Sequence, residues 1–246
     1  MKTTFLWYVF WVSISIGAAS NARVTQINGS ASCLREGTEK WRTVSPQMPL
    51  KNGDKIYTRK ESFIEITLPS GGIIRLNENT KIVLENILSK DESVQCILGD
   101  VWINMKKLVS KKAAFSLSSP TATASIRGTV FSMNAQQDSS TDVAVYEGKV
   151  DVGLTKNRHQ NSPPKAPSSS PGEIAGPSEI PGPFEVTLDQ WRKIVAGQKI
   201  SVRSDGTFAE TKFNPQKEAE NDAFVKFNQT LDKKLESMNT QEKKAD

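Results

Sequence analysis

The sequence predicts an all-β fold with an amphipathic α-helix at its C-terminal end. Short runs in which apolar and polar residues alternate recur at intervals of roughly 8 to 12 residues, which is typical of an all-β domain. Glycine, asparagine and aspartate stand between the runs, where turns form. After residue 213 the apolar residues recur every three or four positions, which is the period of a helix.

Two arrangements of the strands are compatible with this pattern. The regular interval favours a β-roll or a solenoid-like fold, in which each coil stacks on its neighbour. No strict sequence repeat accompanies the interval, so a sandwich of two sheets remains open as well.

Residues 1–22 have the organisation of a secretory signal peptide. Lys2 precedes an uncharged apolar run at 5–16, and mostly small residues follow up to Ala22. The run is shorter than the roughly 20 apolar residues that a membrane anchor needs. We therefore expect an exported protein, periplasmic or secreted, whose processed chain is soluble and has no membrane span.

The net charge of the chain does not indicate a particular class of binding partner. The 246 residues include 32 Lys and Arg against 27 Asp and Glu, a net charge of +5. Lys2 is the only charged residue in 1–22, so the exported part has 31 basic and 27 acidic residues, a net charge of +4. This excess is modest, and export argues against nucleic acid as a natural partner.

We expect residues 23–156 to form the main part of the β domain. The run at 63–68 shows the alternation, with Ile64, Ile66 and Leu68 on one face. The expected strands are 63–68, 73–76, 81–84, 94–98, 101–105, 114–118, 129–134, 143–146 and 149–152. Turn residues separate them, including the pair Gly99-Asp100.

A proline-rich segment at 157–183 interrupts the strand pattern. It holds seven of the twelve prolines and too few apolar residues for a core, so we interpret it as a linker or surface insertion. Strand signals return at 184–188 and 199–202, and Asp205-Gly206 predicts a hairpin. We expect 184–213 to complete the β domain, with Trp191 and Ile194 packed on it.

The segment 214–240 is expected to be one amphipathic helix, followed by a flexible tail at 241–246. Asn214 can cap it, and Pro215 is tolerated in its first turn. The expected apolar stripe comprises Ala223 or Phe224, Phe227, Leu231, Leu235 and Met238. The charged residues on the other faces, Asp232 among them, have mixed sign. The stripe either packs on the β domain or binds a partner or a second copy, and the partner face would be Phe224, Phe227, Leu231 and Leu235.

Few residues suit catalysis or metal binding. The chain has one histidine, His159 in the proline-rich segment, and no phosphate-loop or zinc-finger spacing. We expect no cofactor, no metal and no enzyme of the zinc or His-based hydrolase classes. A carbohydrate-active enzyme that uses two carboxylates remains the alternative, with Asp54, Glu85, Asp100 and Glu147 available. For Asp54 and Asp100, which follow glycine, turn formation is the better interpretation.

The two cysteines and a group of lysines each have two interpretations. Cys33 and Cys96 either form a disulfide, which an exported protein would retain, or remain two free, buried thiols. The lysines 106, 107, 111 and 112 either bind an anionic lipid or glycan or lie on a solvated loop between strands, and we take the loop as the default.

One signature in the sequence resembles the FecR-like domain family. An apolar residue, Ile126, is followed by Arg127, Gly128, Thr129, Val130 and the aromatic Phe131. A later strand reaches Glu147-Gly148 and resumes with Val150. The resemblance covers residues 50–154 and 184–211.

The resemblance implies a periplasmic interaction or sensing domain whose ligand the fold does not define. Regulators of this family also have a cytoplasmic segment that restrains a sigma factor and a transmembrane helix, and neither is recognisable in this sequence. Glycines at 128 and 148 suit backbone geometries that other residues avoid, and Arg127 and Glu147 can pair, so the signature is either architectural or ligand-binding. We expect a non-enzymatic exported module that binds a protein or a cell-envelope component. The alternatives are the carboxylate enzyme and an oligomeric envelope scaffold joined through its C-terminal helix.

Overall fold

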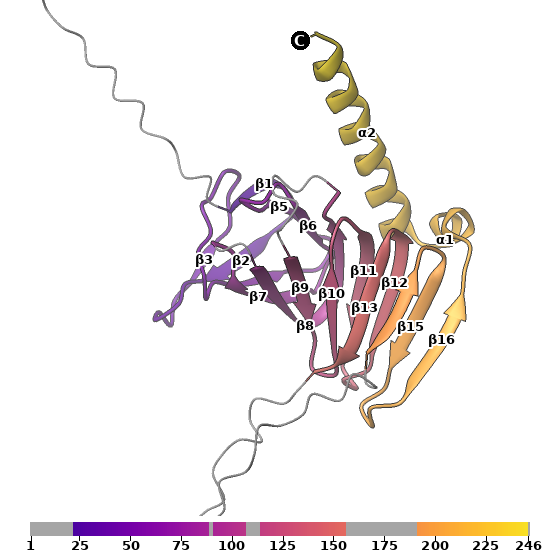
Figure 1. Ribbon diagram of the computed structural model, residues 1–246. Coiled ribbons are helices and arrows are strands. Elements are labelled where there is room, and N and C mark those ends of the chain that lie inside the picture. The colour runs from indigo at the N-terminus through magenta and orange to yellow at the C-terminus, as the bar shows by residue number, and fades with distance from the viewer. Residues whose placement is uncertain (1–21, 89–90, 107–113, 156–190, 246) are drawn as a thin grey trace, which may run out of the picture.

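The computed structural model describes residues 22–88, 91–106, 114–155 and 191–245 (Figure 1). Several predicted features lie outside these residues: residues 1–21 of the expected signal peptide, the proline-rich segment with His159, the expected strand at 184–188 and the lysines 107, 111 and 112. The described part holds sixteen strands and two helices, so the all-β class with C-terminal helical structure is confirmed. The strands are β1 (Arg23–Asn28), β2 (Ala31–Leu34), β3 (Trp41–Thr43), β4 (Lys55–Thr58), β5 (Phe63–Thr67), β6 (Ile73–Leu76), β7 (Lys81–Asn86), β8 (Asp91–Asn104), β9 (Ala114–Ser118), β10 (Ala122–Ile126), β11 (Val130–Ala135), β12 (Thr141–Glu147), β13 (Lys149–Leu154), β14 (Arg192–Val195), β15 (Gln198–Val202) and β16 (Phe208–Lys212).

The strands form two layers that share one long strand. The first layer, called sheet A here, has the order β1-β5-β6-β8-β11-β12-β15-β16. The second layer, sheet B, has the order β3-β2-β4-β7-β8-β9-β10-β13-β14. Strand β8 belongs to both layers, because residues 91–98 pair with β7 and β9 whereas residues 99–104 pair with β6 and β11.

The passage of β8 from one layer to the other corrects an expectation. Gly99-Asp100 was expected to separate two strands, but it lies inside a single strand of 14 residues. Gly99 has a φ of +95°, and a Cβ there would lie 2.5 Å from Thr80 Oγ1. Only glycine fits such a close approach with a positive φ, so the residue bends the strand and does not end it.

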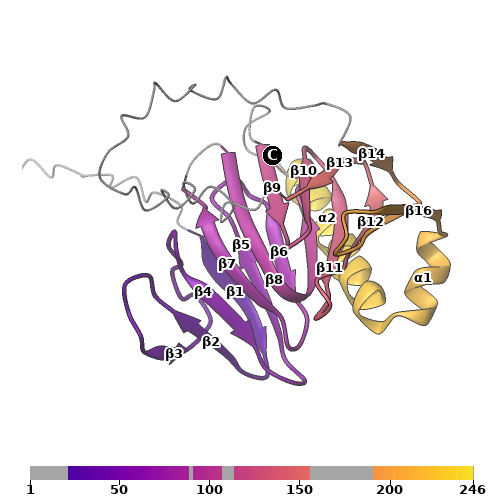
Figure 2. The same ribbon diagram turned by 90° about the horizontal axis from the view of Figure 1, so that it is seen from below.

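The chain winds through both layers in one direction. Consecutive strand pairs alternate between sheets, and each new pair is added beside the previous one, as Figure 2 shows from below. One continuous core fills the space between the layers, with Ile64, Ile74 and Phe131 from sheet A and Ile56 and Leu117 from sheet B. The fold therefore combines the stacked layers of a sandwich with the progressive winding of a roll.

Six strands were not recognised in the sequence as strands: β1, β2, β3, β4, β10 and β14. Most of them contain small or charged residues instead of a clear run of branched apolar ones; β10, for example, reads ATASI. Ala122, Ala124 and Ile126 nevertheless alternate inward and are buried. Tertiary pairing with β9 and β13 makes this segment a strand in spite of its composition.

The strands after residue 191 extend both layers. β14 pairs with β13 in sheet B, and the hairpin β15–β16 pairs with β12 in sheet A. The turn of that hairpin contains Gly206 at a φ of +82°, as expected for Asp205-Gly206. Ile194 is fully buried, whereas Trp191 is 40% exposed and lies against Gly153.

The C-terminal segment forms two helices where one was expected. Helix α1 (Pro215–Asn221) is capped by Asn214, whose side chain accepts hydrogen bonds from the backbone N–H groups of Gln216 and Lys217. Asp222 then adopts an extended conformation, with φ −122° and ψ 112°. Helix α2 (Ala223–Ala245) follows and includes most of the expected tail.

Helix α2 lies against the outer face of sheet A and then projects beyond it (Figure 1). Val225 of this helix belongs to a small apolar cluster with Trp102 and Tyr146, separate from the main core. In the part of the chain that the structure describes, no helix is long and apolar enough to span a membrane.

Candidate functional site

The outer face of sheet A carries a row of large polar and aromatic side chains below α2. Glu65 of β5, Arg75 of β6 and Trp102 of β8 are direct cross-strand neighbours. Their strand neighbours Ile64, Ile74 and Val101 point into the main core. Because side chains alternate between the faces of a strand, the row has to point outward, toward the helix.

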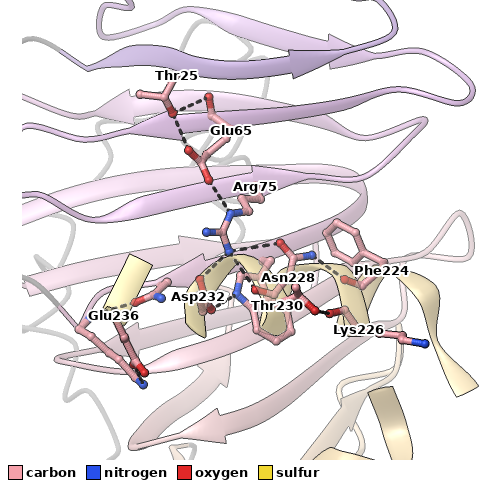
Figure 3. A network of polar contacts seen from close by, with 12 residues as sticks. Thr25, Glu65, Arg75, Phe224, Lys226, Asn228, Thr230, Asp232 and Glu236 are labelled. Carbon is pink, nitrogen blue, oxygen red and sulfur yellow. Dashed lines mark hydrogen bonds and ion pairs between the residues drawn. The ribbon is translucent and has the colours of Figure 1, made fainter. Parts of the chain in front are cut away.

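Arg75 is the centre of a buried polar network (Figure 3). Its side chain is fully buried, and its Nε donates to Glu65 Oε2 at 2.7 Å. Its Nη1 donates to Asp232 Oδ1 of α2 at 2.6 Å and lies 3.4 Å from Asn228 Oδ1. Its Nη2 is buried and has no hydrogen-bond partner among the described residues.

Asp232 joins the helix to two strands at once. Its Oδ1 accepts from Arg75, and its Oδ2 accepts from Trp102 Nε1 at 3.0 Å. On the other side of Arg75, Thr25 Oγ1 donates to Glu65 Oε1 at 2.8 Å. One buried cation thus lies between two carboxylates, and further donors use the remaining carboxylate oxygens. Buried charges are tolerated when they are paired and hydrogen-bonded in this way.

The sequence predicted helical structure in this segment but misjudged the inner face of α2. Val225, Asn228 and Asp232 are the buried residues, at a spacing that puts them on one side of the helix. Phe224, Leu231 and Leu235 flank this face and are half-buried, so the expected stripe forms only the margin of the contact. Phe227 is 42% exposed, although its ring packs edge-on against Phe63 at 4.9 Å, and Met238 is 52% exposed.

Asp222 gives α2 its starting point. Its Oδ1 accepts hydrogen bonds from the backbone N–H groups of Phe224 at 2.8 Å and Val225 at 3.1 Å, which is N-cap geometry. Beside this point, Tyr146 packs on Trp102 with ring centroids 4.5 Å apart and on Phe213 at 5.4 Å. Burial raises the pKa of Tyr146 to about 12, so this aromatic group stays neutral.

A second ionic contact lies further along α2. Lys106, which follows β8 by two residues, pairs with Glu236 of the helix at 2.6 Å and with Glu147, the last residue of β12. Burial alone would lower the pKa of Lys106, but hydrogen bonds and charge from the two glutamates raise it. Lys106 is the one member of the predicted lysine group that the structure describes. Its two ion pairs connect the end of β12 to helix α2.

The FecR-like signature residues meet where two turns pack together. Thr129 is buried, and its Oγ1 donates to the backbone oxygen of Lys149 at 2.8 Å, while Phe131 points into the main core. Gly148 has a φ of +82°, and a Cβ there would lie 3.0 Å from Thr129 Oγ1. Gly128 has a φ of +64°, with open space where its Cβ would be.

The polar signature residues are exposed. Arg127 and Glu147 both face solvent, and Glu147 pairs with Lys106 and not with Arg127 as the sequence had suggested. The contacts of Thr129, Phe131 and Gly148 are internal to the fold, which is what an architectural role requires.

The two cysteines do not form the bridge that the sequence left open. Both are free and buried, Cys33 in β2 and Cys96 in β8. Along sheet B, Cys33 pairs with Ile56, Ile56 with Ile82, and Ile82 with Cys96. The two cysteines are therefore three strand spacings apart, about 14 Å, whereas the Cα atoms of a disulfide lie within about 7 Å. Burial raises the pKa of Cys33 to about 11 and that of Cys96 to about 12.

The four carboxylates considered for catalysis lie on different elements, and three of them have local partners. Asp54 is buried and accepts from Arg35 and from the backbone N–H of Lys51. Asp100 of β8 accepts from Asn134 Nδ2, and Glu147 pairs with Lys106. Glu85 is exposed on β7. Among the described residues, no group of three or more His, Cys, Asp or Glu side chains is placed to hold a metal ion.

A shallow polar hollow of about 380 Å³ lies near the β15–β16 turn, with Asp138, Asp142, Ser201, Arg203 and Asp205 in its wall. Hydrogen bonds from Ser140 lower the pKa of Asp138, and hydrogen bonds from Thr207 lower that of Asp205. Asp142 pairs with Lys199 at 3.1 Å. A lowered pKa disfavours Asp138 and Asp205 as the general acid that glycoside hydrolysis requires.

A comparison with protein-family models supports the resemblance in the sequence. Residues 54–151 match the family model described as FecR protein. A comparison with curated protein sequences finds no match. Two crystal structures of a candidate anti-sigma factor from Parabacteroides distasonis are similar to this chain, each at 18% identity with a TM-score of 0.46. Each similarity covers 65% of this chain and 60% of that protein, so the chain spans less than two thirds of its length.

Proposed function

We propose that this chain, whose residues 54–151 match the FecR family model, is an exported, non-enzymatic module that binds a protein or a cell-envelope component in signal transduction. The FecR match is the observation that carries the proposal. The fold is consistent with it, because the winding layers bury their apolar residues in a continuous core and leave the edges and the helix for contact.

The binding surface should lie away from the FecR-like signature. Thr129, Phe131 and Gly148 make contacts within the fold, and those contacts hold two turns together. A ligand for this module then has to be recognised by exposed side chains elsewhere.

The exposed side of α2 is the surface that suits a protein partner best. Phe227 and Met238 are large apolar side chains with about half their surface exposed, at 42% and 52%. The Arg75–Asp232 and Lys106–Glu236 contacts anchor the helix on sheet A, and the helix then projects beyond the layers (Figure 1). An anchored helix that presents apolar side chains is a common element of helix-in-groove recognition.

Photo-crosslinking in the producing cell tests this surface. A photoreactive amino acid is placed at Phe227 or Met238, and at Trp41 of β3 as a control with the same 42% exposure as Phe227. We expect one specific protein adduct from the two helix positions and none from position 41. Absence of any adduct from the helix positions, or the same adducts from position 41, would contradict the proposal.

Two further experiments test the other parts of the proposal. Residues 1–22 fused to alkaline phosphatase should direct the enzyme out of the cytoplasm, and a cytoplasmic fusion would contradict export. The purified chain should release no sugars from isolated envelope polysaccharide or peptidoglycan. Release that is lost in Asp142→Asn would favour the carboxylate enzyme instead.

A further inference from the structure

Strand β16 is an open edge of sheet A. It pairs with β15, and no other strand of the described chain pairs with it. Its residues are half-exposed or exposed along the whole strand, in the sequence FAETK. The edge therefore presents backbone groups that can accept another strand.

The hydrogen-bond pattern defines which residues of β16 face outward. Arg203 donates its N–H to the oxygen of Thr207 at 2.9 Å, and Phe213 donates to Gly197 at 2.9 Å. In an antiparallel pair the hydrogen-bonded positions alternate, so Ala209 and Thr211 also bond to β15. The backbone N–H and C=O groups of Phe208, Glu210 and Lys212 consequently point away from β15.

Glu210 and Lys212 carry opposite charges at these two outward positions. Both side chains are exposed, and they share one face of the strand because they are two residues apart. A lysine on an edge strand normally deters another strand. A glutamate two residues before it changes this effect, because an antiparallel copy of the same strand can place each glutamate opposite a lysine.

We propose that β16 pairs antiparallel with β16 of a second copy of this chain, around a two-fold axis at Thr211. In this register Glu210 lies opposite Lys212 of the second copy, and Lys212 lies opposite its Glu210. Each of these pairs exchanges two backbone hydrogen bonds, and the threonines meet at the axis, which is a favourable cross-strand pair. The two copies of sheet A then form one continuous sheet.

The neighbouring registers are less favourable. An axis at Glu210 places the two glutamates opposite each other, and like charges opposite each other destabilise a strand pair. An axis at Ala209 places Glu210 opposite Phe208 and pairs no charges. Charge complementarity therefore selects the register around Thr211.

The contact is short, so the dimer should depend on protein concentration. The dimer contact uses β16 and not the exposed side of α2. The inference goes beyond the proposed function, because the module can bind its partner as a monomer or as a dimer. It also differs from a scaffold joined through the C-terminal helix.

Sedimentation velocity over a range of concentrations tests the pairing with the purified chain. Glu210→Lys should weaken the dimer by about tenfold or more, because it places lysine opposite lysine twice. The double variant Glu210→Lys with Lys212→Glu should restore the wild-type association, since the charges are complementary again. Glu220→Lys on the exposed side of α1 makes the same change of charge outside the edge and should have no effect.

A proline provides a second test that does not depend on charge. Glu210→Pro removes an N–H that points outward and leaves the β15 bonds intact, so the hairpin should persist and the dimer should be lost. The thermal unfolding of each variant checks that it is folded. A wild-type chain that stays monomeric at all concentrations would overturn the inference. So would a dimer that persists in Glu210→Pro or fails to return in the double variant.

Discussion

Asp232 of helix α2 accepts a hydrogen bond of 2.6 Å from the buried Arg75 of β6, across 157 positions of the sequence. Two of the three buried residues on the inner face of α2, Asn228 and Asp232, are polar, and the half-buried apolar side chains lie at the margin of the contact. Such an interface fixes one orientation of the helix, because only one rotation satisfies both Arg75 and Trp102. It also makes helix docking sensitive to single substitutions.

Asp232→Ala should reduce the free energy of unfolding by about 2 to 3 kcal/mol, because Arg75 and Trp102 lose a buried charged acceptor while Glu65 still neutralises Arg75. Arg75→Met should cost more, about 3 to 5 kcal/mol, since it leaves two carboxylates without their common cation. Glu236→Ala, in an exposed ion pair one helical turn away, should cost about 1 kcal/mol or less. Urea titrations measure all three. If Asp232→Ala and Glu236→Ala had equal effects, the buried network would contribute no more to the free energy of unfolding than an exposed ion pair.

We expect the free energy of unfolding to fall as the pH rises above 4.5, because Glu92 then has to ionise in a buried position. This glutamate is buried, and burial raises its pKa from 4.5, although hydrogen bonds from Ser70 oppose the shift. Between the unfolded and the folded pKa the native state holds more protons, so its stability falls with increasing pH. Glu92→Gln should remove this slope in unfolding experiments from pH 4 to pH 8. A slope that is unchanged in the variant would assign it to other groups.

Both cysteines should be unreactive in the folded protein and reactive after unfolding. Burial raises their pKa values to about 11 and 12, so neither is a thiolate at neutral pH. Ellman's reagent without reductant should detect no thiol in the native chain and two thiols in denaturant. Detection of none in denaturant would indicate a disulfide, and would require a different arrangement of β2, β4, β7 and β8.

The two signature glycines should respond differently to alanine. Gly148→Ala should cost about 1 to 3 kcal/mol, because the φ of +82° is strained for alanine and its Cβ would crowd Thr129 Oγ1. Gly128→Ala should cost about 1 kcal/mol, since it meets the strain of a positive φ without crowding. Thermal and urea unfolding compare them. Equal costs would mean that the contact between the two turns does not matter for stability.

Local chemistry in the sequence was sufficient for several elements. Asp205-Gly206 predicted the hairpin between β15 and β16, because aspartate and glycine suit its turn. Asn214 before Pro215 predicted the start of α1, and alternation predicted the buried faces of strands such as β5. The break at Asp222 was missed, although aspartate is a common N-cap residue and the two N–H groups that it caps are local.

Local sequence patterns were not sufficient to predict the candidate site around Arg75 and Asp232. Asp232 was assigned to a mixed-charge outer face, whereas the structure buries it with Arg75. One signal was present, because Asn228 and Asp232 share a helical face with the apolar Val225, and a polar pair on an inner face indicates a buried polar partner. The partner itself comes from a strand far away in the sequence, and periodicity does not identify it.

By itself the sequence determined the class of fold, the buried faces of many strands, the Asp205-Gly206 turn, the Asn214 cap and the FecR-like signature. Each of these features depends on residues that are close together in the chain. Tertiary structure alone decided that β8 joins two layers, that two strands lie between Cys33 and Cys96, and that Arg75 receives Asp232. These features follow from which strands pair and which face a helix covers. Strand order and long-range contacts depend on the packing of the whole chain, and a local pattern of apolar residues is compatible with several such packings.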